Sequence, residues 1–160
     1  MQRIDPVAKA LAALAIVLVL GAGLPSSLEA EVITAAGYLR KVAAKSATDA
    51  TSTQATSYVN VEHGVVTFTS TVPGPVLITF CASTITTGGG TVFIRAKLDG
   101  ITLGGYQDRI FLFDGNESTC GQWLEPGVPA GQHTVRIRWK VESSETAWLE
   151  NRTLTVQYSK

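Results

Sequence analysis

Three cations recur at every second position near the end of the chain. Residues 133–141 read HTVRIRWKV, in which Arg136, Arg138 and Lys140 alternate with apolar residues. Successive side chains of a β-strand point to opposite faces, so the pattern predicts one apolar and one basic face, with cations about 7 Å apart. Three interpretations stay open: a solvated outer face, pairing with Asp and Glu on a neighbouring strand, or contact with an acidic face of another copy of the chain.

Side chains that commonly carry catalysis are sparse. The two histidines are His63, interpreted as a turn residue between strands, and His133, at the start of the basic segment. The sequence contains no nucleophile elbow, zinc-protease helix, phosphate-binding loop or dinucleotide-binding fingerprint. A solvated loop explains the acidic residues 142–150. We therefore expect a protein that is not an enzyme and has no cofactor.

The segment DGNES, residues 114–118, combines oxygen-bearing side chains with a glycine. Ca²⁺ prefers oxygen ligands, but the segment lacks the spacing and the terminal glutamate of an EF-hand loop. We interpret it as a turn and expect no metal site. It also contains a glycosylation sequon at Asn116, and a second sequon starts at Asn151. Both asparagines lie beside predicted turns and are candidate glycosylation sites.

Two cysteines, Cys81 and Cys120, fit an oxidising compartment. A bridge between them would close a loop of about 40 residues, for which the chain-entropy estimate is roughly 4 kcal/mol. Two buried free thiols are the alternative. We expect the disulfide, and with it an extracytoplasmic protein.

Exposed aromatic rings can stack on sugar faces, which makes the tryptophans candidates for glycan binding. Trp139 lies on the apolar face of its predicted strand, so we expect it in the core. Trp123 follows a cysteine in a segment of no clear period, and Trp148 lies in a predicted hairpin. These two are the candidates for stacking on a surface glycan.

The first 30 residues carry a targeting signal. Arg3 and Lys9 precede residues 10–24, which are uncharged and as a helix would span about 22 Å, less than a hydrocarbon core. A signal peptide cleaved after Ala30 and a retained membrane anchor are the two interpretations. If residues 7–24 are retained, they are the expected membrane contact. In either case the rest of the chain lies outside the cytoplasm.

Two further segments precede the region of strands. In residues 31–45, apolar side chains recur at a helical period and cations gather toward the end, which predicts a short stalk helix. Residues 46–57 form a Ser/Thr-rich tract that predicts a linker or an extended leader into the first strand. With residues 1–30, these segments make an N-terminal appendage.

Residues 58–160 show short apolar alternations separated by turn signals, among them Asp99-Gly100. This predicts an all-β, jelly-roll-like antiparallel β-sandwich, preceded by the N-terminal apolar helix and the stalk helix. The 160 residues allow one domain with an appendage. Thirteen basic and thirteen acidic residues give a net charge of zero, which argues against a nucleic-acid partner.

Four segments, GPVLITFCAS, VFIRAKLDG, PAGQHTVRIRWKV and NRTLTVQY, together resemble the jelly-roll modules of bacterial surface proteins and phage structural proteins. The resemblance extends more distantly to C1q/TNF-like proteins. It implies an oligomeric β-sandwich used for assembly or attachment. The cysteine pair and the segment FDGNESTCGQW depart from the pattern.

The N-terminus adds a second resemblance. AK followed by ALAALAIVLVL is similar to the cleavage context of archaeal type IV pilins, although two glycines and a proline interrupt the long helix of a pilin. This implies a filament subunit.

We therefore expect a structural or attachment protein that self-associates on a cell or virus surface, as a filament or oligomer subunit. Arg136, Arg138 and Lys140 would be subunit contacts at the rim of the interface, and residues 31–57 would tether or swap between copies. The alternative is a carbohydrate-binding module that uses Trp123 or Trp148.

Overall fold

The computed structural model describes residues 39–87, 90–104, 109–111, 117–143 and 145–159, all of which belong to a compact unit formed by residues 35–160. The expectations for residues 1–38, for the turn at 114–116 and for Asn116 lie outside the described residues. Among the described residues there is no helix that is long and apolar enough to cross a membrane.

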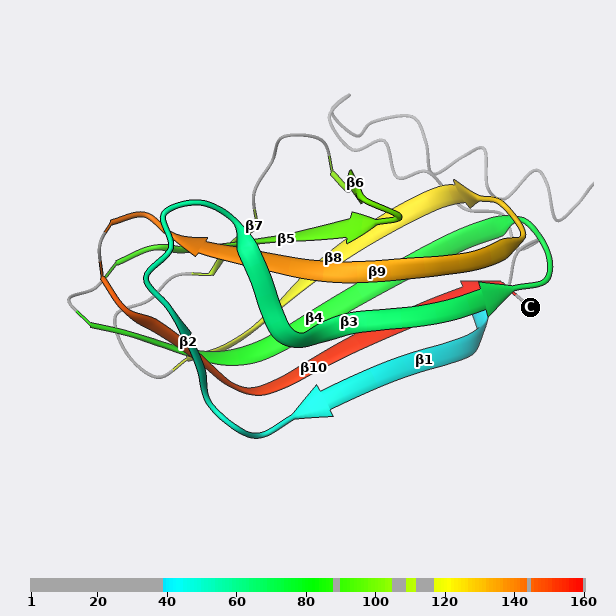
Figure 1. Ribbon diagram of the computed structural model, residues 1–160. Helices are drawn as coiled ribbons and strands as arrows, with labels where there is room; N and C mark the ends of the chain where they lie inside the picture. The colour runs from blue at the N-terminus through cyan, green and yellow to red at the C-terminus, as the bar shows by residue number, and fades with distance from the viewer. Residues whose placement is uncertain (1–38, 88–89, 105–108, 112–116, 144, 160) are drawn as a thin grey trace, which may run out of the picture. The chain divides into compact units, whose positions relative to one another are not determined.

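Two antiparallel sheets pack face to face, and their strands run roughly along the length of the domain (Figure 1). Sheet A has the order β1-β10-β4-β8, with the short β2 also paired to β10, and sheet B has the order β3-β9-β5-β6, with β7 also paired to β5. The strands of sheet A are β1 (Leu39–Ala47), β2 (Thr51–Thr53), β4 (Gly74–Thr86), β8 (Glu117–Val128) and β10 (Ala147–Ser159). Those of sheet B are β3 (Val59–Ser70), β5 (Val92–Leu98), β6 (Ile101–Thr102), β7 (Arg109–Phe111) and β9 (Gly131–Val141).

Without the two short strands β2 and β6, the order is that of an eight-stranded jelly roll. The first strand, β1, pairs with the last, β10, in sheet A, and β3 pairs with β9 in sheet B. Along the chain, these eight strands alternate between the two sheets. The exception is the pair β5 and β7, which follow each other and are neighbours in sheet B. The expected jelly-roll β-sandwich is therefore confirmed.

The core lies between the sheets and is built by the alternation that the sequence shows. In β5 the side chains of Val92, Ile94, Ala96 and Leu98 are buried, while their neighbours lie on the outer face. Trp139 of β9 is 1% exposed, as expected. Because both sheets follow this period of two, each has one apolar inner face and one outer face that is free to carry function.

The first strand corrects two expectations. Residues 39–45, expected in a stalk helix, form β1 and pair with β10 from Leu39 to Ala47. The spacing of small apolar residues there suits a helix or a strand, and the open edge of β10 decides between them by supplying backbone hydrogen bonds. The β-sandwich therefore already includes Leu39, and does not start at residue 58 as expected. The Ser/Thr tract is part of it as well, because it contributes β2 to sheet A.

Candidate anion-binding groove

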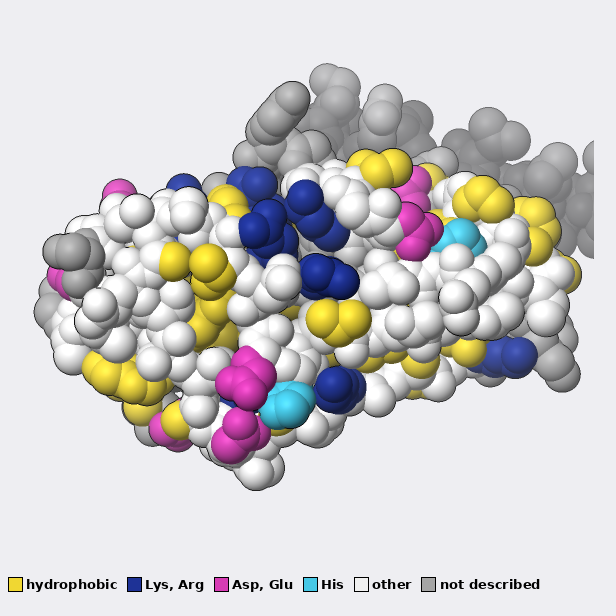
Figure 2. Space-filling view, viewed as in Figure 1, with side chains coloured by type: hydrophobic (Ala, Val, Ile, Leu, Met, Phe, Trp, Pro, Cys, Tyr) yellow, Lys and Arg dark blue, Asp and Glu magenta, His cyan; other side chains and the backbone are white. Residues whose placement is uncertain are grey.

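The outer face of sheet B gathers cations from two neighbouring strands. Arg136, Arg138 and Lys140 of β9 point away from the core, as expected, and β5 adds Arg95 and Lys97. The antiparallel register places Arg95 opposite Arg138 and Lys97 opposite Arg136. In Figure 2 a cluster of dark blue side chains accordingly lies over β5 and β9, while a few others lie apart from it. One of the open interpretations is that the basic row pairs with Asp and Glu on a neighbouring strand. On β5 the residues opposite Arg138 and Arg136 are the cations Arg95 and Lys97, so this interpretation does not hold there.

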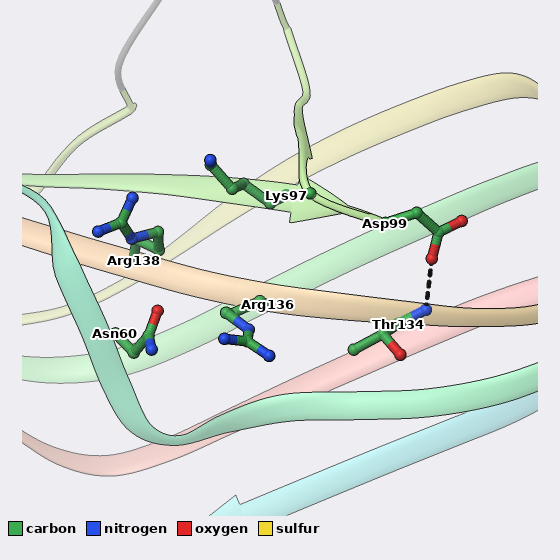
Figure 3. A pocket seen from close by; sticks show the side chains of 7 residues that line it. Asn60, Lys97, Asp99, Thr134, Arg136 and Arg138 are labelled. Carbon is green, nitrogen blue, oxygen red and sulfur yellow. Dashed lines mark hydrogen bonds between the residues drawn. The ribbon is translucent and has the colours of Figure 1, made fainter.

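A groove with a volume of about 610 Å³ runs through this face. We call it the basic groove. Its lining residues are Asn60, Lys97, Asp99, Gly100, Thr134, Arg136 and Arg138. Figure 3 shows Asn60 on β3, Arg136 and Arg138 on β9, and Lys97 on β5 around a common space. None of these described side chains is apolar.

Three cations of this face, Arg138, Arg95 and Lys140, are held by contacts with neighbouring residues. Arg138 donates a hydrogen bond from Nη2 to the carbonyl oxygen of Tyr58, and its buried Nε has no hydrogen-bond partner among the described residues. The Arg95 guanidinium lies 3.5 Å from the centroid of the Tyr58 ring. The Lys140 ammonium lies 4.6 Å from the centroid of the Phe93 ring. These cation–π contacts fix Arg95 and Lys140 against the sheet.

Lys97 and Arg136 lack such anchors. Within the described part of the chain, neither forms an ion pair, a cation–π contact or a side-chain hydrogen bond. Like charges directly opposite on adjacent strands are destabilising. The arrangement therefore concentrates positive charge that the described residues do not neutralise.

Among the described residues that line the groove, the one acidic side chain is already engaged. Asp99 accepts a hydrogen bond from the Thr134 amide (2.8 Å) through Oδ1, and its Oδ2 lies 2.7 Å from His133 Nδ1. His133 Nε2 donates to the carbonyl oxygen of Pro129 at 2.9 Å. With Nε2 donating to a carbonyl, a carboxylate beside Nδ1 favours a second ring proton, and hence the imidazolium.

The pKa shifts agree with this geometry. The hydrogen bond to Asp99 raises the pKa of His133, against an opposing effect of burial. Burial raises the pKa of Asp99, but the hydrogen bonds from His133 and from the Thr134 amide outweigh it, so the net pKa is lowered. Asp99 therefore fixes the end of the groove, where the β5–β6 turn meets β9, and Lys97 and Arg136 have no acidic partner in the described part of the chain.

The disulfide between Cys81 and Cys120 is present, and the alternative of two free thiols is wrong. The two cysteines are directly opposite each other on β4 and β8, with a Cα–Cα distance of 4.1 Å. Their neighbours Phe80 and Gly121 are buried, so the bridge lies on the outer face of sheet A.

The tryptophans proposed for sugar stacking lie elsewhere. Trp123 is 3% exposed, so the expectation that its ring is available to a glycan is wrong. The segment around it is the regular strand β8, whose alternation points Trp123 into the core. Trp148 is half-buried on sheet A, between Ser52 of β2 and Ile85 of β4. Neither ring lines the basic groove.

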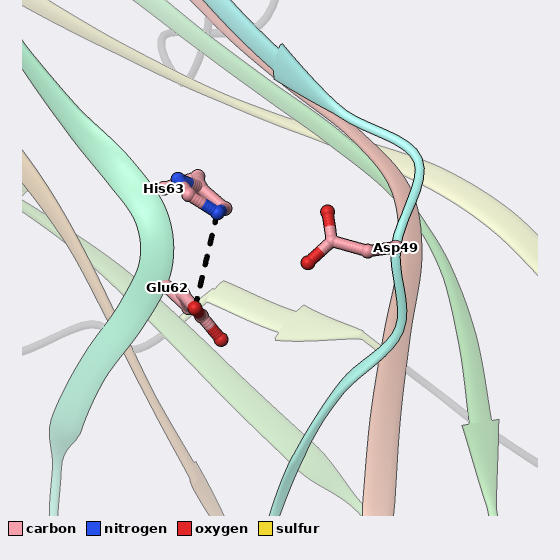
Figure 4. Close-up of side chains that lie close together, drawn as sticks. All are labelled: Asp49, Glu62 and His63. Atoms are coloured by element: carbon pink, nitrogen blue, oxygen red, sulfur yellow. Dashed lines mark ion pairs between the residues drawn. The ribbon is translucent and has the colours of Figure 1, made fainter.

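A second cluster, of potential metal ligands, was not predicted from the sequence. Donor atoms of Asp49, Glu62 and His63 lie within 4.8 Å of one another, and all three side chains are exposed (Figure 4). Their carboxylate oxygens and imidazole nitrogen are donors that a divalent metal accepts. His63 has a φ of 57° at an irregularity in β3 that interrupts the pairing with β9. Asp49 comes from the tract interpreted as a linker, so nothing in the sequence placed it beside β3.

A buried arginine organises the backbone beneath this cluster. Arg152 is 2% exposed and donates from Nε to the carbonyl oxygen of Glu62 at 2.9 Å. Its Nη1 donates to the carbonyl oxygens of Asp49 and, at 3.3 Å, of Leu149. The neighbouring residue Asn151, a candidate glycosylation site, is exposed with a φ of 45° where the pairing of β10 with β4 is irregular. Its modification stays a prediction.

No protein-family model matches the chain, and no curated protein matches it in sequence. Among solved structures, the chain is similar to a protein of the T13 viral particle of IBDV, with a TM-score of 0.51, 11% identity, and coverage of 77% of this chain and 32% of that one. At this identity the likeness shows the β-sandwich fold alone.

Two further solved structures have lower scores. The insecticidal delta-endotoxin Cry8Ea1 from Bacillus thuringiensis gives a TM-score of 0.47 and 11% identity. The match covers 73% of this chain and 24% of the toxin chain. A family 35 carbohydrate binding module from Clostridium thermocellum gives 0.42 and 11% over 71% of this chain and 97% of that one. The resemblances to C1q/TNF-like proteins and to archaeal pilins stay expectations from the sequence.

Proposed function

We propose that the chain is a non-enzymatic attachment protein of a cell or virus surface and that the basic groove holds an anionic partner. The observation that carries this proposal is the register of β5 and β9, which sets Lys97 opposite Arg136 and Arg95 opposite Arg138. The fold gains nothing from placing Lys97 opposite Arg136, because like charges across a sheet repel and neither side chain forms an ion pair with a described residue. An anion between the two strands would turn that repulsion into attraction.

One observation argues against a catalytic role for His133, and another supports a location outside the cytoplasm. His133 is buried, and both of its ring nitrogens are engaged with Asp99 and Pro129, so the ring has no free nitrogen for proton transfer to a substrate. The disulfide fits an oxidising compartment. A jelly-roll sandwich with one charged outer face then serves as a rigid support for contact with a surface.

The test compares two double variants with the same loss of charge. Lys97→Gln/Arg136→Gln removes two cations of the basic groove, and Lys41→Gln/Lys45→Gln removes two cations from β1 of the other sheet. We expect the unmodified protein to bind at least one polymer from a panel of polyglutamate, single-stranded DNA, polygalacturonate and dextran sulfate. The affinity should fall as salt rises.

The groove variant should lose about tenfold in affinity and the β1 variant much less, since only the first removes contacts with the partner. Equal losses in the two variants would show that net charge and not the groove is responsible. No binding to any polymer at low salt would exclude an anionic partner.

Self-association is a second candidate function, and the position of β1 favours it. Among the described residues, β1 is an edge strand of sheet A that pairs with β10 alone, and Ala43 packs against the core. A first strand at the edge of a sheet can be supplied by another copy, as the expected swapping of residues 31–57 requires. In this arrangement Arg136, Arg138 and Lys140 would meet acidic residues of a second copy.

Sedimentation equilibrium over a range of protein concentrations tests self-association. We expect a defined oligomer that Lys97→Gln/Arg136→Gln weakens, because the groove cations would contact acidic residues of the second copy. A monomer at the highest concentration reached would exclude this second candidate and leave the binding of an external anion in place.

A further inference from the structure

The lining of the basic groove narrows the class of anion. Protein interfaces are anchored by aromatic and apolar residues at their centre, with charges at the rim. Among the described residues, this groove is instead lined by the cations Lys97, Arg136 and Arg138 and by no apolar side chain. An acidic protein would therefore find charge here but no anchor.

The aromatic residues of the same face are poorly placed for nucleic acid. Single strands are held by stacking bases on exposed aromatic rings beside the cations. Tyr58 and Phe93 are half-buried, and Arg95 and Lys140 already lie over their rings. The groove thus offers a nucleic acid its phosphate contacts alone.

Polar uncharged side chains complete the groove. The Asn60 amide lies beside Arg138 in the register of β3 and β9, and the Thr134 hydroxyl lies beside Thr67. Amide and hydroxyl side chains can each donate and accept hydrogen bonds. They can therefore bond to the hydroxyl groups of a sugar, which also donate and accept. Next to them, the Arg136 guanidinium can grip a carboxylate or a sulfate through two parallel hydrogen bonds.

We infer that the basic groove binds an acidic polysaccharide, an inference that rests on the proposed function. Lys97 and Arg136 contact the carboxylate or sulfate groups, and Asn60 and Thr134 contact the hydroxyl groups of the sugars. Because side chains on one face of a strand repeat at about 7 Å, β9 can present Arg136 and Arg138 to successive anionic groups of a linear chain. This mode of glycan binding needs neither Trp123 nor Trp148.

The test ranks polymers by dissociation constant in one buffer, with polygalacturonate and dextran sulfate as the acidic polysaccharides. Polyglutamate and single-stranded DNA are the acidic polymers of other classes, and neutral dextran is the uncharged control. We expect at least one of the two polysaccharides to bind about tenfold tighter than polyglutamate or DNA, and dextran not to bind. Whichever of the two binds tighter identifies the anionic group, carboxylate or sulfate.

Two variants separate the contacts with hydroxyl groups from those with charge. Asn60→Ala should weaken polysaccharide binding several-fold and leave polyglutamate binding unchanged, since polyglutamate carries no hydroxyl groups. Lys97→Gln/Arg136→Gln should weaken both. All three side chains line the outer face of the sheet, and a urea unfolding curve for each variant checks that the fold is kept.

Polyglutamate or DNA binding as tightly as both polysaccharides would overturn this inference while leaving the proposed anionic partner in place. Equal losses on polysaccharide and polyglutamate in Asn60→Ala would also overturn it. Failure of every polymer to bind would remove the proposed function together with the inference.

Discussion

Lys97 and Arg136 face each other directly across β5 and β9 on the outer face of sheet B. Both are cations, and neither has an acidic partner among the described residues. Cross-strand pairs of opposite charge stabilise a sheet and pairs of like charge destabilise it. A protein that keeps such a pair on an otherwise well-packed sandwich gives up stability at the place where we propose that it binds.

A single charge reversal should therefore stabilise the fold and weaken binding. In Lys97→Glu, the new carboxylate pairs with Arg136, and we expect the free energy of unfolding to rise by about 0.5 kcal/mol at low salt. Urea unfolding of the variant and of Lys45→Glu, an exposed substitution on β1, measures the difference. If Lys97→Glu were less stable than the original protein, Lys97 and Arg136 would not repel each other in the folded state as their positions in the sheet imply.

The contact between His133 and Asp99 should make stability depend on pH in a defined window. Because the pKa of His133 is raised, its contribution is full below the ordinary histidine value of 6.5 and is lost as pH rises through the raised pKa. Because the pKa of Asp99 is lowered, its contribution is present above 3.8 and is lost as pH falls through the lowered pKa. The pair therefore stabilises the fold most between these values.

Unfolding free energies measured across this pH range, for the original protein and for Asp99→Asn, check the window. We expect the variant to lose stability in mildly acidic solution and to differ less from the original above the raised pKa of His133. His63→Asn, which changes an exposed histidine, serves as the control. A constant difference between Asp99→Asn and the original at all pH values would argue against a charged pair.

The sequence predicted features that depend on local alternation and missed those that depend on which strands meet. The inward positions of Ile94 and Trp139 follow from a period of two that burial imposes on each strand separately. The meeting of Lys97 with Arg136 follows from the pairing of β5 with β9, two strands that are distant in sequence, and no local pattern encodes that register.

Two wrong predictions, for residues 39–45 and for Trp123, have the same cause, because strand pairing between distant segments determines both. Residues 39–45 carry small apolar residues that fit a helix or a strand, and the edge of β10 at the far end of the chain decides between them. Trp123 follows a stretch rich in turn-forming residues, yet pairing with β4 extends β8 through it and turns its ring inward. Tertiary contacts outweigh local preference in both places.

Arg152 is predicted to be the most costly polar residue to remove. Its guanidinium is buried and donates hydrogen bonds to the backbone carbonyls of Asp49 and Glu62, from two separate segments. In Arg152→Met these carbonyls lose their partner, and we expect a loss of about 3 kcal/mol in the free energy of unfolding. Asp49→Asn should cost about 1 kcal/mol or less, because the Asp49 side chain is 57% exposed and solvent screens its ion pair.

Urea unfolding of the two variants separates the contributions of backbone and charge. An Arg152→Met protein as stable as the original would mean that water replaces the guanidinium. Equal large losses in both variants would mean that the ion pair, and not the hydrogen bonds to the carbonyls, holds the segments together.

The disulfide should stabilise the sandwich although it joins strands that are already paired. Cys81 and Cys120 are separated by 39 positions, so the bridge restricts the unfolded chain over the whole stretch that contains β5. We expect Cys81→Ala/Cys120→Ala to lose about 2–4 kcal/mol, with the upper end set by the entropy of a loop of this length. Thermal unfolding with and without reductant measures the loss. Reductant should lower the Tm of the original protein toward that of the double variant, and the Tm of the variant should not respond to it. A reductant effect that persists in the variant would show that the reductant does not act through this bridge.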